Sequence, residues 1–259
     1  MIYEKIKRKL QDKIRTIFSK KPRRVPKEYA DRFTLNNTIP IIYKFRDDEY
    51  SPKKPPIFSK EYISNLKEKA LRKEEWYYGE TDKFLFQALE KYKNYIFNKE
   101  GLDVGSVTGW YSAIVLAYGA KKSSILEYNP LISEDEKIEI LDLKKFWENP
   151  KKFDFITSIS SFEHDGLGRY GDPIDPDADL KIMEKMKKIL KQDAIMFLSV
   201  PIGKDTLVWN IHRIYGKIRF PLLIKGWKII DSFGFKESDF NRDYKNFIQP
   251  IFVLKNEKT

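Results

Sequence analysis

The stretch KEGLDVGSVTGWYSAIVLAYGAKKSSILEYN, residues 99–129, decides the fold. It reads as a short apolar strand ending in Asp103, a turn bracketed by glycines, an apolar helix from Trp110 to Tyr118, and a second strand ending in Glu127. A glycine-rich turn between a strand and a helix lets backbone amides approach a ligand closely. An acidic side chain at the tip of the next strand is placed to accept hydrogen bonds from a ribose. We therefore expect a β-α-β unit that holds a nucleoside-like cofactor.

The alternation of strands and helices continues to the end of the chain. A helix is expected around 179–190, and LKKFWENP (143–150) is expected to turn the chain. Five further apolar runs read as strands, the last two as an antiparallel pair: 137–142, 153–160, 194–201, 227–233 and 247–256. This order predicts an α/β protein with a doubly wound, mostly parallel sheet of seven strands and a terminal antiparallel hairpin. Residues 202–226 read as a basic and aromatic insert.

Residues 1–80 are expected to form an N-terminal helical and irregular extension, and residues 81–259 the domain that carries the sheet. Residues 1–24 predict a basic amphipathic helix, which either contacts a membrane surface or packs on the protein or on a second subunit. Residues 21–58 are rich in proline and read as a wrapping or lid segment, with a short strand in TIPIIYKF (38–45). Two helices follow, one over about 59–75 and one starting near Thr81. Between them, the aromatics of WYYGE (76–80) either close over a cofactor or pack between the helices.

Composition limits the classes of function. The 259 residues are 41% hydrophobic and 15% aromatic, which suits a folded α/β core. The chain has no Cys, so we expect no disulfide and no thiolate metal site, and the cytoplasm is the expected compartment. No apolar run approaches the roughly 18 residues that cross a bilayer. The formal net charge of +11 favours an anionic partner.

From Gly101 to Asn256, the order of these signals resembles the class I S-adenosylmethionine-dependent methyltransferases. The glycine motif of that superfamily, acidic-x-Gly-x-Gly-x-Gly, is matched at three positions, with Val107 in place of the middle glycine: Asp103, Gly105 and Gly109. The resemblance implies a Rossmann-like fold.

Two later segments narrow the resemblance. SFEHDGLGRYGDPIDPDADL (161–180) and HRIYG (212–216) resemble an uncharacterised methyltransferase-like family often associated with surface-polysaccharide loci. The resemblance covers roughly the last 160 residues and leaves the N-terminal hundred uncovered.

The resemblance also implies a cofactor site. S-adenosylmethionine would be held at its methionine part by Asp103 and the Gly105–Gly109 backbone, and at both ribose hydroxyls by Glu127, since a carboxylate accepts two hydrogen bonds at once. Asp142 would take the adenine amino group beside the Leu143 backbone, and two serines would lie along the methionine chain. The implied set is Asp103, Gly105, Ser106, Thr108, Gly109, Trp110, Glu127, Asp142, Leu143, Ser160 and Ser161.

The loop after the 153–160 strand is where chemistry is expected, because functional loops lie outside the carboxyl ends of such strands. Methyl transfer to a hydroxyl requires alignment with the methyl group and a base for the proton. His164 is the expected general base, with an ionisation near neutrality, and Glu163 or Asp165 orients it or serves instead. A surface histidine satisfied by its neighbours is the alternative reading.

Arg169 and Tyr170 follow as candidates for binding the acceptor, with Arg169 clamping a phosphate or carboxylate. His212 and Arg213, in the insert, are candidates for the same task. Three aspartates could hold a hard cation such as magnesium, although Asp-Pro pairs are ordinary turn chemistry, and we favour the turn. They are Asp172, Asp175 and Asp177.

Three classes of function fit these patterns. The first is a methyltransferase acting on an anionic sugar, sugar nucleotide or phosphorylated precursor of a surface glycan, with the acceptor a small molecule and no nucleic-acid partner. The second is a nicotinamide-dependent oxidoreductase, because Glu127 would serve NAD equally well, although the turn lacks G-x-G-x-x-G. The third is a non-catalytic binding protein associated with membrane or nucleic acid. A homo-oligomer and contact with the inner face of the membrane are compatible with the first class.

Overall fold

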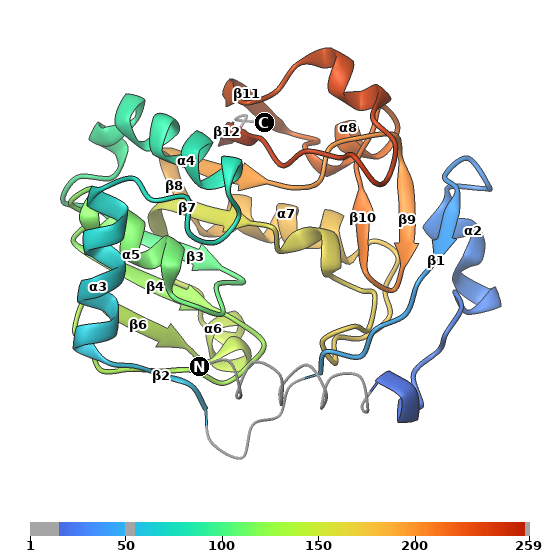
Figure 1. Ribbon diagram of the computed structural model, residues 1–259, viewed down its shortest axis with the longest axis horizontal. Helices are drawn as coiled ribbons and strands as arrows, with labels where there is room; N and C mark the ends of the chain where they lie inside the picture. Colours follow the sequence, from blue (N-terminus) through green and yellow to red (C-terminus); the bar gives the residue numbers. More distant parts are fainter. Residues whose placement is uncertain (1–15, 50–54, 257–259) are drawn as a thin grey trace.

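The computed structural model describes residues 16–49 and 55–256 and is built around one sheet of seven strands (Figure 1). The strand order is β11-β12-β8-β7-β3-β4-β6. Strands β6, β4, β3, β7 and β8 are parallel neighbours, whereas β12 is antiparallel to both β8 and β11. The strands are β3 (Glu100–Val104), β4 (Lys122–Leu126), β6 (Ile138–Leu141), β7 (Phe153–Ile159), β8 (Leu190–Ser199), β11 (Trp227–Phe233) and β12 (Ile251–Asn256). The predicted doubly wound, mostly parallel sheet with a terminal antiparallel pair is confirmed.

The direction of winding reverses at β3. The chain steps from β3 to β4 and β6 on one side, and then returns to β7 and β8 on the other side of β3. The loops that leave the carboxyl ends of β3 and β7 therefore diverge and open a crevice, the usual place for ligands in such sheets.

Helices cover both faces of the sheet. Successive side chains of its strands point to opposite faces, and both sets are largely apolar, so each face is buried. One face packs on α3 (Lys60–Leu71), α4 (Glu80–Lys91) and α5 (Trp110–Ala117). The other packs on α6 (Leu143–Glu148), α7 (Ala178–Ile189) and α8 (Arg219–Leu223). The short 3-10 turns are η1 (Lys27–Tyr29), η2 (Lys93–Tyr95), η3 (Phe162–His164) and η4 (Glu237–Asn241).

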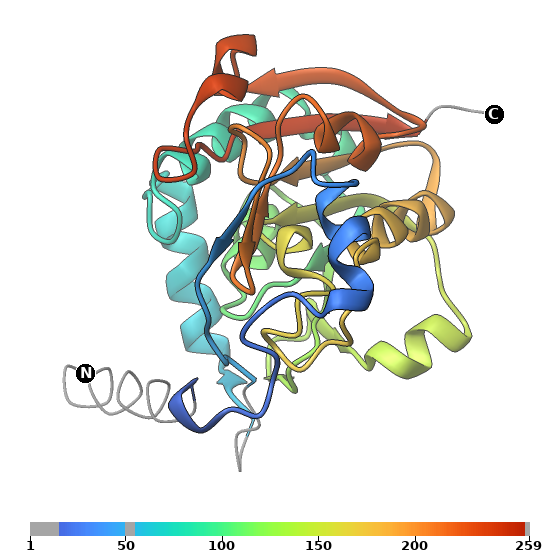
Figure 2. The same ribbon diagram turned by 90° about the vertical axis from the view of Figure 1, so that its right-hand side faces the viewer.

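Two small sheets attach the N-terminal extension to the rest of the chain. β1 (Ile41–Tyr43) pairs in parallel with β9 (Thr206–Trp209), which pairs with β10 (His212–Ile214). β2 (Ile57–Phe58) pairs with β5 (Ile132–Ser133). Figures 1 and 2 both show β1 and α2 (Ala30–Thr34) beside the β9–β10 hairpin. The extension and the basic insert thus form one unit at the edge of the molecule.

Several predicted elements are present with small changes. The helix expected over 59–75 is α3, whose cap Ser59 accepts a hydrogen bond from the Tyr62 amide. The short strand in TIPIIYKF is β1. LKKFWENP was expected only to turn the chain, but its first six residues form α6, because the Asp142 side chain caps that helix.

Part of the predicted N-terminal extension packs with the domain that carries the sheet. α3, from the extension, packs in the same hydrophobic cluster as α5, so this part of the extension belongs to the layer of helices on the sheet. The predicted helix over 1–24 falls mostly on residues 1–15, outside the described residues. Among the described residues, no helix combines the length and the apolar character that crossing a bilayer requires.

Candidate functional site

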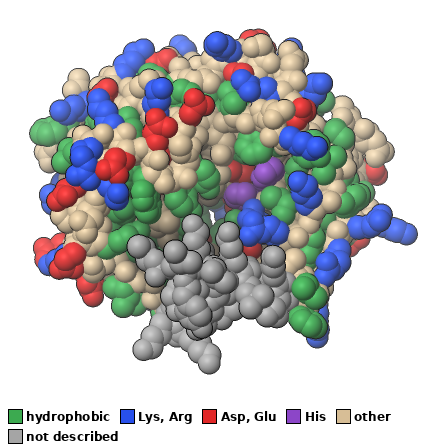
Figure 3. Space-filling view, in the orientation of Figure 1, with side chains coloured by type: hydrophobic (Ala, Val, Ile, Leu, Met, Phe, Trp, Pro, Cys, Tyr) green, Lys and Arg blue, Asp and Glu red, His purple; other side chains and the backbone are tan. Residues whose placement is uncertain are grey.

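A cavity of about 460 Å³ lies at the carboxyl ends of β3, β4 and β7. Figure 3 shows a hollow in this face with histidine, acidic and basic side chains at its edge. It is lined by residues of the predicted set, by others from the extension, and by residues of the sheet domain that were not predicted: Arg46, Asp48, Pro56, Tyr77, Tyr78, Gly105, Ser106, Val107, Thr108, Tyr111, Glu127, Tyr128, Asn129, Leu131, Ile159, Ser160, Ser161, His164, Asp165, Arg169 and Tyr170. The switch point of the sheet is therefore hollow, as the winding requires.

The turn after β3 forms the floor of one end of this cavity. Gly105 has φ +80°, and a Cβ at this position would lie 2.2 Å from the Ser161 Oγ, so only glycine fits. Gly109, at φ +71°, precedes the first turn of α5. The Thr108 carbonyl oxygen accepts a hydrogen bond from the Tyr62 hydroxyl at 3.1 Å, which ties the turn to α3. Backbone of this turn is thus held open to a ligand.

Asp103 lies beneath the turn and does not line the cavity. Its Oδ2 accepts a 2.7 Å hydrogen bond from Ser112 Oγ on α5, and its Oδ1 has no hydrogen-bond partner within the described chain. Burial raises the pKa of the Asp103 carboxyl to about 7. Asp103 therefore joins β3 to α5, and its predicted contact with the methionine part of a cofactor stays a prediction.

Glu127 follows the last residue of β4 and lines the cavity. Its Oε1 accepts hydrogen bonds from the backbone amide and the side-chain amide of Asn129, both at 3.0 Å. Burial raises the pKa of the Glu127 carboxyl, and the Asn129 bonds oppose that rise. The carboxylate is thus oriented by Asn129 at the tip of the strand, where the predicted ribose contact would be made.

Five tyrosines form much of the cavity wall: Tyr77, Tyr78, Tyr111, Tyr128 and Tyr170. Three of them are tied to the buried carboxylate of Asp82. Its Oδ2 accepts from the Tyr77 and Tyr78 amides, at 2.7 and 3.3 Å, and its Oδ1 accepts from the Tyr111 hydroxyl at 3.1 Å. The aromatics of residues 76–80 therefore contribute to the cavity, while Trp76 packs on Trp110 at a ring distance of 5.3 Å.

His164 lines the opposite end of the cavity, on η3. Its Nδ1 lies 2.7 Å from the Ile211 carbonyl oxygen and must donate to it, so Nε2 is the nitrogen free to accept a proton. Burial, followed by the nearby Arg169 charge, lowers the pKa of His164 to about 3. The expected ionisation of His164 near neutrality is therefore wrong, because the imidazolium would be desolvated beside a guanidinium.

Glu163 is fully buried behind His164 and does not line the cavity. Its Oε1 accepts a hydrogen bond from Ser160 Oγ and lies 3.6 Å from His164 Nε2, while its Oε2 has no partner within the described chain. Burial raises the pKa of Glu163 to about 7. Ser160 itself has φ +56°, an uncommon conformation for a side chain other than glycine, which marks the end of β7 as constrained.

Asp165, Arg169 and Tyr170 complete this end of the cavity. Burial, with the nearby Asp172 charge, raises the pKa of Asp165 well above its usual value. Arg169 donates through Nε and Nη2 to Asp48 Oδ2 at 2.8 and 2.7 Å, and through Nη1 to the Ile211 carbonyl oxygen at 3.1 Å. Its guanidinium lies over the Tyr170 ring at 4.8 Å. Arg169, predicted to bind an anionic group of the acceptor, is thus paired with Asp48, a carboxylate of the chain itself.

Several predicted site residues lie outside the cavity. Trp110 is fully buried in the core, and Gly109 contacts the side chains of Phe58 and Ile63. Asp142 is exposed and accepts from the Lys145 amide at 2.8 Å as the cap of α6, with Leu143 as the first residue of that helix. Neither Asp142 nor Leu143 lines the cavity, so their predicted adenine contact has no counterpart in its wall.

His212 and Arg213 also lie outside the cavity lining. The His212 ring is 6.3 Å from the His164 ring, and burial lowers the pKa of His212 to about 4. Arg213 is buried and donates to the Asp165 and Pro176 carbonyl oxygens, at 2.6 and 3.2 Å. Arg213 therefore holds the loop that follows β7, because its guanidinium satisfies backbone carbonyls that no strand or helix pairs.

The three aspartates behave as turn and ion-pair residues. Asp172 accepts from the Gly168 and Tyr170 amides, Asp175 pairs with Lys181, and Asp177 pairs with Arg32. Among the described residues, no group of three or more His, Cys, Asp or Glu is arranged to hold a metal ion.

Sequence reasoning missed two kinds of cavity residue. Tyr128 and Asn129 directly follow Glu127, and their position after a strand on the ligand edge of the sheet was a usable signal. For Arg46 and Asp48 the sequence held no usable signal, because these residues reach the cavity through the pairing of β1 with β9.

The chain is a Rossmann-like protein with a cavity at the switch point of its sheet. The chain belongs to the family described as "Caenorhabditis protein of unknown function, DUF268", whose model matches residues 98–247. No curated protein matches the sequence.

Three solved structures illustrate what the chain is similar to. An S-adenosylmethionine-dependent methyltransferase from Clostridium acetobutylicum ATCC 824 is 12% identical over 76% of this chain and 99% of that chain, with a TM-score of 0.47. A putative S-adenosylmethionine-dependent methyltransferase from Listeria monocytogenes is 13% identical over 68% and 98%, with a TM-score of 0.46. A ribosomal protein L11 methylase from Lactobacillus delbrueckii subsp. bulgaricus is 11% identical over 71% and 81%, with a TM-score of 0.45.

Proposed function

We propose that the chain transfers a methyl group from S-adenosylmethionine to a hydroxyl of a small acceptor. One observation carries this proposal: a single cavity joins the glycine turn and Glu127 at one end to His164 at the other. The first end has the parts that a nucleoside cofactor needs, and the second has a proton acceptor.

The residues of the first end fit the cofactor. Gly105 leaves room for a ligand against the backbone where a Cβ would meet Ser161, and Glu127 presents a carboxylate held by Asn129. Tyrosine faces and carboxylates suit a ligand that carries a positive sulfonium and an ammonium group. The Gly105–Thr108 backbone would hold the methionine part and Glu127 the ribose. Ser160 and Ser161, which line the same cavity, would lie along the methionine chain.

The second end fits removal of a proton. S-adenosylmethionine, when bound, would supply a methyl group on a positively charged sulfur and would leave as S-adenosylhomocysteine. His164 Nε2 would take the proton of an acceptor hydroxyl, since Nδ1 already donates to the Ile211 carbonyl oxygen. The Glu163 carboxylate, with Oε1 3.6 Å from Nε2, stabilises the imidazolium so formed.

Charge and family resemblance support the class of acceptor. An anionic small molecule is favoured by the net charge of +11 and by the arginines of the cavity wall, Arg46 and Arg169. Its assignment to a sugar, sugar nucleotide or phosphorylated precursor of a surface glycan rests on the family resemblance of residues 161–180 and 212–216. We propose further that residues 1–24 pack on the rest of the protein or on a second subunit, with contact to the inner face of a membrane as the alternative.

Binding measurements test the proposal directly. In calorimetry on the full chain, we expect S-adenosylmethionine and S-adenosylhomocysteine to bind with one site each, and NAD not to bind. Binding of NAD without S-adenosylmethionine would instead identify an oxidoreductase, since Glu127 suits either ribose.

A further inference from the structure

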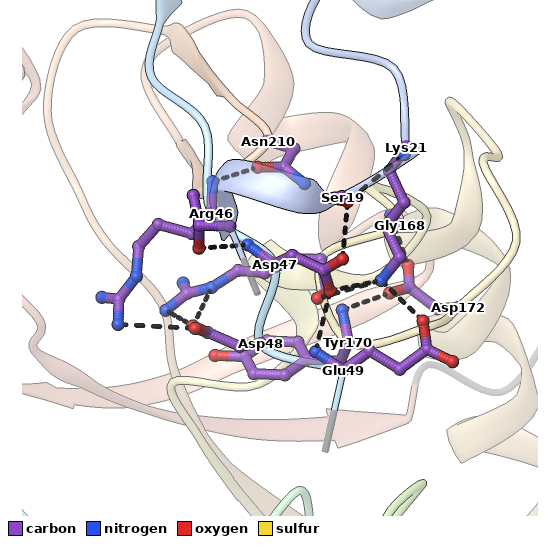
Figure 4. Close-up of polar contacts among 12 residues, drawn as sticks. Ser19, Lys21, Arg46, Asp47, Asp48, Glu49, Gly168, Tyr170, Asp172 and Asn210 are labelled. Carbon is purple, nitrogen blue, oxygen red and sulfur yellow. Dashed lines mark hydrogen bonds and ion pairs between the residues drawn. The ribbon is translucent and has the colours of Figure 1, made fainter. Parts of the chain in front are cut away.

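Residues 44–49, which we call the strap, close one side of the cavity at its acceptor end. The strap continues from β1 and is held along its length by backbone hydrogen bonds. The Lys44 amide donates to the Trp209 carbonyl oxygen at 2.7 Å, the Arg46 amide to Asn210 Oδ1 at 3.0 Å, and the Asp48 amide to the Arg169 carbonyl oxygen at 3.0 Å. Figure 4 shows the strap between Asn210 and the 168–172 loop.

Alternate side chains of the strap point in opposite directions. Arg46 and Asp48 line the cavity. Asp47 turns away from it, and its two oxygens bind Ser19 Oγ at 2.6 Å and Lys21 Nζ at 2.8 Å (Figure 4). Two consecutive aspartates thus have separate tasks: Asp47 anchors the strap, and Asp48 faces the ligand space.

Two guanidinium groups share the single carboxylate of Asp48. Arg169 Nε and Nη2 both donate to Oδ2, at 2.8 and 2.7 Å, while Arg46 Nη2 lies 3.4 Å from Oδ1. The Arg169 side chain is only 10% exposed, and a guanidinium so buried is strongly destabilising without an anion beside it. Arg46 is half exposed and has room to adjust.

Arg46, Arg169 and Asp48 together carry a net positive charge at this end of the cavity. Arg46 and Arg169 against Asp48 give two positive charges and one negative. Burial favours the uncharged forms of the three other titratable groups that line this end, His164, Asp165 and Tyr170. A ligand group with a single negative charge would neutralise the cluster.

We propose that Asp48 stands in the place of an anionic group of the acceptor: an acceptor carrying one carboxylate or phosphate ester binds Arg169 in exchange, while Asp48 stays paired with Arg46. The exchange leaves no buried guanidinium unpaired at any stage, which keeps its free-energy cost low. This inference rests on the proposed function for its acceptor. It also assigns selection of the acceptor to the N-terminal extension, because the strap lies outside residues 98–247, the part that the family model matches.

Anion binding to four full-length proteins tests the exchange without any acceptor in hand. They are the wild type, Asp48→Asn, the matched control Asp47→Asn, and Asp48→Asn combined with Arg169→Gln. With inorganic phosphate and, separately, acetate as probes in calorimetry, we expect Asp48→Asn to bind at least one of them about tenfold more tightly than the wild type, because the internal competitor is gone. Asp47→Asn stays within about twofold of the wild type, and Arg169→Gln removes the gain. The probe that gains affinity shows which anion the site prefers.

Equal affinities of the two single variants overturn the exchange, and so does a gain that survives Arg169→Gln. If Asp48→Asn does not fold, the wild type still decides: the Arg169 Nε–H resonance shifts saturably on titration with phosphate or acetate if the exchange occurs, and an unmoved resonance overturns it. Titration with S-adenosylmethionine separates this inference from the proposed function. A wild type that shows the exchange but binds no S-adenosylmethionine contradicts the function alone. A chain that binds S-adenosylmethionine but shows no exchange contradicts the inference alone.

Discussion

At the scale of single residues, His164 and Glu163 divide the acid–base work in an unexpected way. The histidine is placed to accept a proton through Nε2, but burial and Arg169 keep its pKa near 3. The buried glutamate, the preceding residue in the same 3-10 turn, is the group whose pKa is raised to about 7. The group that receives the proton and the group that titrates near neutrality are therefore different residues.

Replacing His164 by Asn keeps a similar volume and removes the proton acceptor. We expect turnover with the true acceptor to fall by about 10²–10⁴-fold, the usual contribution of a positioned base. S-adenosylmethionine affinity, measured by calorimetry, should stay within about twofold, since His164 lies at the other end of the cavity from Glu127. Retention of more than about a tenth of the wild-type turnover would assign the base to another group, with Asp165 tested first and His212 next.

Glu163→Gln tests which residue titrates. Turnover of the wild type should rise with pH through about 7, because the ionised Glu163 carboxylate stabilises the imidazolium of His164. In the Glu163→Gln variant we expect this rise to disappear and turnover above pH 7 to fall. A pH profile that keeps its inflection in the variant would assign the ionisation elsewhere.

Glu127→Ala tests the cofactor end. Loss of a carboxylate that accepts two hydrogen bonds should cost about 1.5–3 kcal/mol, so S-adenosylmethionine affinity should fall at least about tenfold. Glu136→Ala is the matched control, since Glu136 is exposed and pairs only with Lys60 among the described residues. Unchanged affinity in a folded Glu127→Ala variant would remove Glu127 from the ribose site.

Residue-level prediction located correctly those cavity residues whose position follows directly from the end of a strand. Glu127, the Gly105–Thr108 turn and His164 line one cavity because parallel strands bring their carboxyl ends to the same edge. It failed for Asp142, whose side chain is used locally to cap α6, and for Arg213, which is used to satisfy loop carbonyls. A residue type at the right spacing does not reveal which neighbouring group its side chain will hydrogen-bond.

At the scale of elements, the turn between β3 and α5 leaves no room for a side chain at Gly105. Gly105→Ala combines a positive φ with a Cβ placed 2.2 Å from Ser161 Oγ. Gly79→Ala is the matched control, since it has φ +55° and nothing within 4 Å of the new Cβ.

For both alanine variants we expect loss of stability from the backbone strain, of the order of 1 kcal/mol. Only Gly105→Ala should also weaken S-adenosylmethionine binding, by at least about tenfold, because the clash displaces the Ser161 wall. Chemical denaturation and calorimetry measure the two effects. If the two variants lose cofactor affinity equally, the close approach at Gly105 is irrelevant to binding.

Elements that depend on local sequence were predictable, whereas those that depend on tertiary contact were not. The β-α-β units follow from local runs of apolar residues and their turns, and the seven-stranded sheet was predicted on that basis. The pairing of β1 with β9 was not, since Ile41 and Leu207 are joined only by tertiary contact. The strap, and with it Arg46 and Asp48, reaches the cavity through that pairing.

At the scale of the whole molecule, the buried carboxyls couple stability to pH. The pKa of Glu163 rises from 4.5 to about 7 on folding, so the folded chain holds this proton more tightly than the unfolded chain does. Its contribution to stability is fully present below pH 4.5 and is lost as the pH rises through about 7.

We therefore expect Glu163→Gln to gain stability relative to the wild type between about pH 4 and pH 8, by about 1–3 kcal/mol. Urea denaturation at both pH values measures the difference. Glu136→Gln is the comparison. Because Lys60 lowers the pKa of the wild-type Glu136 carboxyl, the change in stability of Glu136→Gln relative to the wild type should be smaller and of opposite sign. A constant difference between the Glu163→Gln variant and the wild type across this range would show that Glu163 does not titrate with folding.

The pairing of β1 with β9 also sets an order of events in time. Ile41 is synthesised 166 residues before its partner Leu207, a wait of roughly 10–30 s at ordinary rates of translation. During that interval β3, β4 and β6 can emerge and begin to assemble with their helices, whereas residues 41–43 still lack their partner strand β9. The wall that faces the acceptor is thus completed only after these central strands are made. A nascent chain arrested before residue 206 should already protect the amides of β3 and β4 from hydrogen exchange, while those of residues 41–48 exchange freely.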